Sequence, residues 1–296
     1  MNENRSIIQN LADDIESIYS VAGAKISGIL EKLMGSDIGY RDISAARGKI
    51  EATINYLNVK ANAWTVKSLP VIYCQQRGQT EKILKRMYGV NLLTVKSDDK
   101  LKAKIRETQG YFHRANASIK TSAEKFFQVA ESATIGIEKL KFRIQEMSGK
   151  DDATIRKIIE TTLNDPSYIH GSHGTQWASS RIRDYLRAMV DGDDFIEING
   201  RFYTIRKYAV MLARTELSNT MFQAVKDECE KWGNDLVEFS SHDKPCPECA
   251  QHEGEIFSLS GNDPDYPLCP NMPIHPNCEH NLNPTSRVAL RARGAA

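Results

Sequence analysis

The chain has 296 residues, of which 41% are hydrophobic and 26% charged, and its formal net charge is +1. Such a composition, without any low-complexity tract, is typical of a soluble globular protein with one large domain or two medium ones. The N-terminal "MNENRSIIQNLADD" carries acidic residues and lacks a long apolar run, so we expect no secretory signal. No window approaches the roughly 18 uninterrupted apolar residues of a membrane span. We therefore expect a reducing cytoplasm, where closely spaced cysteines are more often metal ligands than disulfides.

The near-zero net charge conceals an asymmetry along the chain. Residues 1–150 hold 24 Lys and Arg against 16 Asp and Glu, a balance of +8, whereas residues 151–296 hold 15 against 22, a balance of −7. Most of the basic excess lies between Lys82 and Arg143. A basic half can be the footprint of a polyanion such as DNA. A helical face solvated by lysines is the favoured alternative, because aromatic interleaving and an arginine cluster are both missing.

Long helices are predicted for the N-terminal half. Apolar residues at helical spacing predict a helix over residues 4–34 and a second over residues 42–68, which we expect to end before Pro70. A short helix is predicted over residues 80–88, and one or two long helices over residues 97–147. Helices of this length favour an extended helical arm or bundle over a compact enzyme core.

The middle of the chain contains a plausible domain boundary. "SGKDD" at residues 148–152 offers an aspartate cap for a following helix, and short helices are predicted over residues 153–163 and 179–190. His170 and His173 lie in the Gly-rich loop between these helices. Paired histidines in a polar loop are candidate ligands, but an ordinary surface loop is the favoured interpretation.

The C-terminal half has a different pattern. "FIEINGRFYTI" alternates on both sides of Asn199-Gly200, which predicts a hairpin. An amphipathic helix is predicted over residues 206–232, closed by Gly233, and "DLVEFSS" and "GEIFSL" are predicted strands. The predicted fold class is therefore α+β and predominantly helical. A basic long-helix region at 1–150 precedes a small α+β module, stapled by a metal, at 151–296.

Soft metal ligands are concentrated near the C-terminus, with four of six cysteines and four of seven histidines between His242 and His280. Cys246-x-x-Cys249 has the spacing of a zinc knuckle, in which both sulfurs reach one ion at about 2.3 Å. His275-x-x-Cys278 offers a second pair, and the proline-rich segment between the pairs returns one to the other. This pattern predicts a closed Cys3His zinc site of structural type, without an open position for catalysis.

Alternatives to this ligand set remain open. Cys269 and His280 are the substitutes if one ligand is misassigned. Four unrelated residues or buried free thiols are the less favoured interpretation, because two spaced pairs flanked by prolines favour a metal site. Cys74 and Cys229 each stand alone in the sequence and are expected to be core residues. No catalytic residue is predicted.

Enzymatic interpretations are less favoured. Nucleases of the HNH type also combine Cys-x-x-Cys knuckles with histidine-rich segments such as "HPNCEHN". Their chemistry needs a hairpin followed by a helix, and the "NLNPTSRVALRARGAA" that follows His280 leaves little room for one. A Cys/His protease or transferase is disfavoured further, because prolines flank the thiols and zinc would consume the nucleophile.

Three segments in a fixed order carry a family resemblance. "ARTELSNTMFQAV", "DKPCPECAQHEGEIF" and "PIHPNCEHNLNP" together resemble the phage Mu F-like minor head protein family, also called phage head morphogenesis proteins. The matching positions are Arg214, Thr215 and Glu216, Asp243, Cys246 and Cys249, Gly254 with Phe257, and His275-Pro276-Asn277-Cys278. They span roughly Tyr208 to Pro284, a quarter of the chain. Where the family ends Cys-Arg-Cys, this chain has Cys278-Glu279-His280, which leaves open whether Cys278 or His280 binds the metal.

The resemblance implies a structural minor component of a tailed-phage or prophage virion, located in the capsid interior or at the portal vertex. It implies a role in head morphogenesis, with DNA packaging or ejection as further roles. The implied partners are the portal protein, the major capsid protein, or both, and packaged DNA through the basic N-terminal half. Several copies per virion, synthesis in the bacterial host's cytoplasm and no membrane association are expected. The alternative is an enzyme, either a zinc-supported HNH nuclease or an ADP-ribosyltransferase-like protein.

The Arg-Thr-Glu motif also has a structural interpretation. Arg214 and Glu216 are two residues apart on a predicted helix, so they face different directions and do not pair. We expect both to be buried at a domain seam, each bonded to loop backbone, with Thr215 and Asp243 in the same structural motif. The alternative is a catalytic glutamate of the ADP-ribosyltransferase kind, which needs a nicotinamide pocket that the sequence does not locate.

Overall fold

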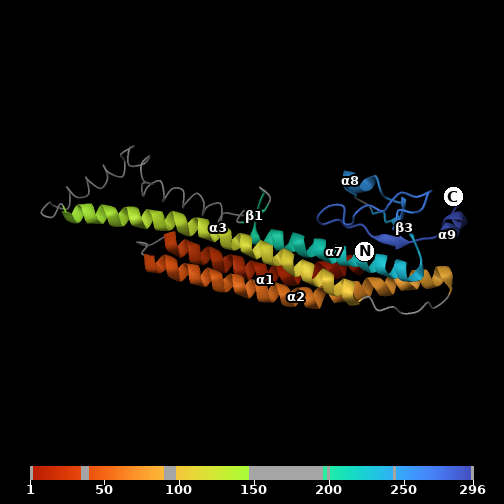
Figure 1. Cartoon of the computed structure of the whole chain (residues 1–296), viewed down its shortest axis with the longest axis horizontal. Coiled ribbons are helices and arrows are strands. Elements are labelled where there is room, and N and C mark those ends of the chain that lie inside the picture. Colours follow the sequence, from red (N-terminus) through yellow and green to blue (C-terminus); the bar gives the residue numbers. More distant parts are fainter. Residues whose placement is uncertain are drawn as a thin grey trace. The chain divides into compact units, whose positions relative to one another are not determined.

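The computed structural model describes residues 3–34, 40–89, 98–146, 196–198, 201–242 and 245–294. In chain order the elements are α1 (Glu3–Met34), α2 (Tyr40–Tyr88), α3 (Asp98–Glu146), β1 (Ile196–Ile198), β2 (Arg201–Tyr203), α7 (Ile205–Trp232), β3 (Leu236–Phe239), α8 (Pro247–Ala250), β4 (Ile256–Ser258), β5 (Leu282–Pro284) and α9 (Arg287–Ala292) (Figure 1). The predominantly helical class with a small antiparallel sheet is confirmed. Within this part of the chain, no helix is both long and apolar enough to cross a membrane.

Several predicted features of the middle of the chain lie outside the residues that the structure describes. These are the boundary at 148–152, the helices at 153–163 and 179–190, and the histidines His170 and His173. The division of the chain near residue 150 therefore stays a prediction.

The helices α1, α3 and α7 confirm the helices predicted from apolar periodicity. The end of α7 follows from one glycine. Gly233 adopts a φ of 64°, a conformation that costs glycine little. Its N–H donates to the Glu230 carbonyl and the N–H of Asn234 donates to the Cys229 carbonyl, at 3.1 and 2.9 Å. This pair of bonds is a Schellman motif, and it turns the chain directly into β3.

The prediction that the second helix ends before Pro70 is wrong. Helix α2 continues through Pro70 for a total of 49 residues and includes the separately predicted segment 80–88. Proline inside a helix removes one hydrogen bond and crowds the carbonyl one turn earlier, at a cost of about 3 kcal/mol. Leu69, Ile72 and Tyr73 are buried beside it, and each such side chain contributes about 1.5–3 kcal/mol. Tertiary burial therefore outweighs the local preference.

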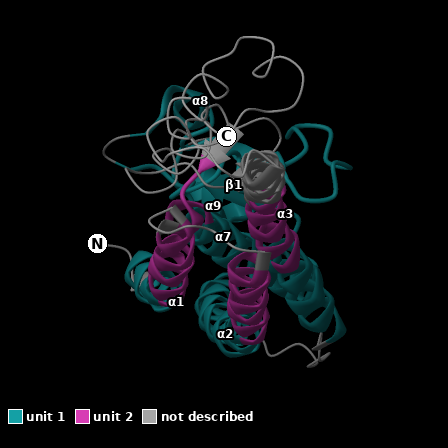
Figure 2. Cartoon of the chain, turned by 90° about the vertical axis from the view of Figure 1, so that its left-hand side faces the viewer, with its two compact units in different colours: residues 1–17, 60–112, 209–296 teal, residues 18–59, 113–208 magenta. Residues whose placement is uncertain are grey.

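The chain forms two compact units that interleave in sequence (Figure 2). The first contains Met1–Ser17, Lys60–Phe112 and Ala209–Ala296, and the second contains Ile18–Val59 and His113–Tyr208. Each of the three long N-terminal helices thus contributes residues to both units.

The core of the second unit is built from one face of each long helix. Its buried apolar residues include Ala22, Ile26, Leu30, Ile43, Ile50, Ile54, Leu57, Ala115, Ile119, Ala123 and Phe127. A buried polar connection joins the same helices: Tyr19 Oη donates to Asn116 Oδ1, and Asn116 Nδ2 donates to Asn58 Oδ1, both at 2.8 Å. Paired in this way, the buried amide fixes the register of the three helices. The predicted hairpin is also confirmed, with Ile198 paired to Arg201.

The first unit is organised around α7. Its buried apolar residues include Ala12, Ile15, Trp64, Ile72, Leu84, Phe112, Ala213, Leu217, Phe222, Val225, Cys229, Val237, Phe239, Phe257, Leu282 and Leu290. Cys229 is buried in this core, as predicted, whereas Cys74 is exposed, so its prediction as a core residue is wrong. Cys74 lies on the solvent side of α2, next to the buried Tyr73.

Two adjacent acids on α7 are buried and paired with N-terminal helices. Asp227 accepts from Tyr73 Oη at 2.6 Å and from Lys100 Nζ at 3.0 Å. Glu228 accepts from Arg77 Nε at 3.0 Å. Buried charges need such partners, because an unpaired charge in a protein interior is costly. Part of the basic excess of residues 1–150 therefore neutralises part of the acidic excess of the C-terminal half within this unit.

A three-stranded antiparallel sheet follows α7, in the order β4-β3-β5. The predicted strands in "DLVEFSS" and "GEIFSL" are confirmed as β3 and β4, with Val237 opposite Phe257. The third strand, β5, was not predicted, and it pairs Phe239 with Leu282. Because β5 lies directly after the His/Cys segment, its pairing returns that segment to the end of β3.

Candidate metal centre

The first half of the site is the Cys-x-x-Cys turn. Cys246 is the N-cap of the short helix α8, with Pro247 in the first helical position, where a missing N–H costs nothing. The backbone N–H of Cys249 donates to Cys246 Sγ at 3.3 Å. This cap holds both sulfurs on one side of the turn, as the zinc-knuckle spacing predicts.

The second half is the segment from His275 to His280. The N–H of Cys278 donates to the carbonyl of His275 at 3.1 Å, which closes a turn, and Asn277 adopts a φ of 62° within it. Asparagine tolerates this conformation better than other non-glycine residues. The segment then continues into β5, so the sheet fixes its position beside the Cys-x-x-Cys turn.

The structure brings the four predicted ligands to one place in two overlapping groups. Cys246, Cys249 and His275 form the first group, in which His275 Nε2 lies 3.2 Å from Cys246 Sγ and 3.1 Å from Cys249 Sγ. His275 Nδ1 donates to the Pro276 carbonyl at 2.9 Å, so in the neutral ring Nε2 carries the lone pair that faces the sulfurs.

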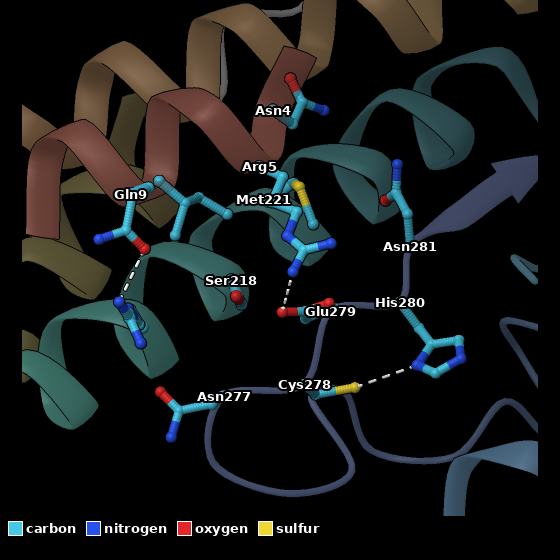
Figure 3. Close-up of a pocket in the computed structure, with 12 residues that line it drawn as sticks. Asn4, Arg5, Gln9, Ser218, Met221, Asn277, Cys278, Glu279, His280 and Asn281 are labelled. Atoms are coloured by element: carbon cyan, nitrogen blue, oxygen red, sulfur yellow. Dashed lines mark hydrogen bonds and ion pairs between the residues drawn. The ribbon is translucent and has the colours of Figure 1, made fainter. Parts of the chain in front are cut away.

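The second group shares Cys249 and adds Cys278 and His280. Cys249 Sγ and Cys278 Sγ are 3.8 Å apart, and Cys278 Sγ lies 3.7 Å from His280 Nδ1 (Figure 3). The alternate ligand His280 is therefore part of the cluster. Among the described residues, the other alternate, Cys269, belongs to no such group, and its sulfur lies 3.6 Å from the Pro270 carbonyl.

A third group supports the second and was not predicted. Glu253 Oε1 accepts from His280 Nε2 and from the backbone N–H of His242, both at 2.9 Å. The His242 and His280 rings pack with centroids 4.2 Å apart. One carboxylate oxygen thus already accepts two hydrogen bonds, so this group orients His280 rather than offering an empty ligand set. A single glutamate in a turn carries no sequence signal for this role.

The two thiols of the Cys-x-x-Cys turn have pKa values shifted in opposite directions. The N–H of Cys249 lowers the pKa of the Cys246 thiol, whereas burial raises the pKa of Cys249. The hydrogen bond to the Pro276 carbonyl raises the pKa of His275. Burial lowers the pKa of His280, which keeps that ring neutral near pH 7. The lowered pKa values of Cys246 and His280 favour the thiolate and the neutral imidazole that a metal requires, whereas the raised pKa values of Cys249 and His275 act against these states.

Thiolates and imidazoles in this arrangement can hold a metal ion. The five donors, three sulfurs and two ring nitrogens, are one more than a tetrahedral ion uses.

A small pocket adjoins the second half of the site and is lined by residues of α1, α7 and the segment Asn277–Asn281 (Figure 3). Its volume is about 110 Å³. Arg5 on α1 donates to Glu279 Oε1 at 2.7 Å, and both side chains are largely exposed. This ion pair connects the metal-site loop to α1 within the first unit.

The Arg-Thr-Glu motif has a structural role that differs in detail from the prediction. Glu216 is buried and accepts from Thr108 Oγ1 at 2.8 Å and Lys104 Nζ at 3.0 Å, both on α3. Arg214 is half-buried and donates to Gln9 Oε1 of α1 at 2.7 Å. Among the described residues, the partners of Arg214 and Glu216 are thus side chains of helices, whereas bonds to loop backbone were expected.

Thr215 and Asp243 are the other two residues of the predicted structural motif. Thr215 Oγ1 donates to the Met211 carbonyl one turn earlier at 2.8 Å, and Asp243 lies outside the described residues. As predicted, Arg214 and Glu216 bond to different partners.

A family model matches part of the chain. Residues 168–285, which are 118 of the 296 residues, match the family model of phage minor capsid protein 2. The matched range includes α7, the three-stranded sheet and all the candidate metal ligands. The resemblance to a phage minor head or capsid protein family is thereby confirmed. No curated protein and no solved structure matches the chain.

Proposed function

From the match to phage minor capsid protein 2, we propose that this chain is a structural minor head protein of a tailed phage or prophage that acts in head morphogenesis. The observation that carries the proposal is the coincidence of two features. The residues that match the family are also those that form the sheet and the Cys/His cluster. The described part of the matched segment thus carries the helix, the sheet and the cluster together.

The proposed location is the capsid interior or the portal vertex, with several copies per virion assembled from protein made in the host bacterium. The proposed partners are the portal protein and the major capsid protein. We also propose a role in DNA packaging or ejection, in which the basic N-terminal half contacts the packaged DNA. Since Lys100, Lys104 and Arg77 pair with acids of α7, the DNA contact would use other basic residues of the N-terminal half.

We further propose a structural zinc ion in the Cys/His cluster. The donor set supports zinc, because thiolate and imidazole are the ligands of structural zinc sites. The loops between β4 and β5 contain little regular structure, and only a minority of their side chains are buried. A metal bound by Cys246, Cys249, Cys278 and a histidine would supply folding energy that these loops lack.

Two observations favour a structural protein over an enzyme. Glu216 is buried with three side-chain partners, which leaves it unsuited to contact a nicotinamide substrate. The helix α9 that follows β5 has six residues, less than the helix expected after a nuclease hairpin. The chemistry available at the cluster is therefore cross-linking of loops.

Co-expression with the portal and major capsid proteins encoded in the same genome tests the proposal. We expect the chain to co-sediment with portal-containing particles, and deletion of its gene to give defective heads. Particles of normal composition and infectivity without it would contradict the structural role. Divalent-metal-dependent DNA cleavage, abolished by His275→Ala or His280→Ala, would favour the nuclease instead.

A further inference from the structure

We propose that Glu253 is a positioning residue of the metal centre: it fixes His280 so that Nδ1 joins Cys249 and Cys278 as a ligand. The inference rests on the proposed zinc ion and answers which histidine binds it. It assigns to Glu253 a role outside the ligand set, as the carboxylate behind a metal-bound imidazole.

The position of Glu253 is determined by the backbone around it. It lies in the turn between α8 and β4, where the N–H of Gly254 donates to the Phe239 carbonyl at 2.9 Å. Gly254 has a φ of 75°, a conformation that favours glycine. Glu253 Oε1 also accepts the backbone N–H of His242 at 2.9 Å. The carboxylate is thus attached to the end of β3 before any metal binds.

The carboxylate selects one tautomer of His280. A carboxylate oxygen only accepts hydrogen bonds, so the 2.9 Å contact to Glu253 Oε1 places the proton on Nε2. In the neutral ring the lone pair is then on Nδ1, which faces Cys278 Sγ. The ring is 1% exposed and packs against Phe239 with centroids 4.7 Å apart. Neither rotation nor solvent competes with this orientation.

The spacing of the second group fits a tetrahedral ion. Zinc bond lengths of about 2.3 Å to sulfur and about 2.0–2.1 Å to nitrogen place two sulfurs roughly 3.8 Å apart and a sulfur–nitrogen pair roughly 3.6 Å apart. The Cys249–Cys278 and Cys278–His280 separations are 3.8 and 3.7 Å. The corresponding separations from His275 Nε2 are 3.2 and 3.1 Å, shorter than the sulfur–nitrogen spacing around a tetrahedral zinc ion.

The surroundings of His275 differ from those of His280. It is less buried than His280, and its Nδ1 is bonded to a backbone carbonyl instead of a carboxylate. Its Nε2 faces both knuckle sulfurs, and it stands outside the ligand group that Glu253 supports.

The test measures zinc affinity of the full chain by competition with a chromophoric chelator. Glu253→Ala is expected to weaken binding roughly 10- to 100-fold, the usual effect of removing an outer-shell partner. Glu253→Gln, whose amide oxygen still accepts from Nε2, should lose less. His280→Ala should cost more than His275→Ala.

Nitrogen-15 NMR of the histidine rings supplies a readout that a merely structural role of Glu253 would not move. In the zinc-bound wild type we expect a metal-bound Nδ1 and a protonated Nε2 in His280, with the Nε2 proton signal lost in Glu253→Ala. Unchanged affinity in Glu253→Ala, or zinc lost in His275→Ala but retained in His280→Ala, would overturn the inference. A wild-type chain that binds no zinc would instead overturn the proposed metal itself.

Discussion

The α7 interface and the Cys/His loops belong to the same compact unit but are held by different means. Helix α7 is held by continuous burial of large side chains and by acids that pair with cations of α2 and α3. The loop between β3 and β4, which carries α8, and the loop between β4 and β5 have few buried apolar side chains among their described residues, and they converge on a cluster of sulfurs and imidazoles.

The difference shows how one chain distributes stability. The apolar area that a packed helix buries increases with its length. The burial along α7 can therefore offset the desolvation cost of several buried carboxylates. A loop that buries little apolar area needs cross-links instead, and the proposed metal ion would join residues that lie 26 to 29 positions apart in the chain. The two regions should therefore unfold in response to different changes: loss of the metal for the loops, and loss of buried pairs for α7.

The largest effect is expected from removing a metal ligand, which should unfold the Cys/His loops and leave the long helices folded. Cys249→Ser, at the sulfur shared by both ligand groups, should abolish zinc binding and expose residues 245–285 to hydrogen exchange. Structural zinc contributes about 10–16 kcal/mol in zinc-finger peptides, more than these loops can replace. Hydrogen exchange with mass spectrometry should show α2 and α3 still protected. Cys74→Ser, at an exposed thiol, is the matched control, and equal protection of the loops in both variants would contradict the cross-link.

An intermediate effect is expected at α7. Glu216→Ala leaves Lys104, whose side chain is 15% exposed, with Glu107 as its remaining carboxylate partner. Breaking a buried pair costs about 3–5 kcal/mol, and we expect the lower end because Glu107 remains. Urea unfolding should show a lower midpoint at an unchanged slope. Glu107→Ala, on the exposed side of the same lysine, should cost less than about 1 kcal/mol. Similar losses for the two variants would mean that the pair at Glu216 behaves like a surface ion pair.

These two regions also differ in how far the sequence predicts them. Apolar periodicity predicts α1, α3 and α7, because each helix buries one face along its whole length. The partners of Glu216 and Glu228 were not predictable, since they lie 108 and 151 residues away and no periodic signal links them. Pro70 misled the prediction because burial of its neighbours outweighs a local helix breaker.

For the metal centre, the spacing of cysteines and histidines predicts which residues converge. It does not predict which atoms face one another. Glu253 acts through one carboxylate oxygen in a turn, and its contact with His280 exists only because β5 pairs with β3. The strand β5 has only three residues and contains a proline, so it is too short for its alternation of apolar and polar residues to predict a strand.

The smallest expected effect concerns a loop cross-link that uses a carboxylate in place of a metal. Asp235 accepts from Ser258 Oγ at 2.6 Å and from the N–H of Ser260 at 2.8 Å. Burial acts to raise the pKa of Asp235, but these hydrogen bonds outweigh it and the pKa is lowered. A carboxyl with a lowered folded pKa stabilises the fold above its unfolded pKa of about 3.9, and this contribution is lost as the pH falls through the folded value.

Asp235→Asn should therefore lower the melting temperature at pH 6, and the difference from the wild type should shrink as the pH falls below 4. The reason is that the protonated wild-type carboxyl then resembles the neutral amide. Asp99→Asn, at a fully exposed side chain, controls for the change in net charge. A difference that stays constant from pH 6 to pH 3 would show that the charge of Asp235 is irrelevant. The loops would then depend on the Cys/His cluster even more completely than the comparison with α7 indicates.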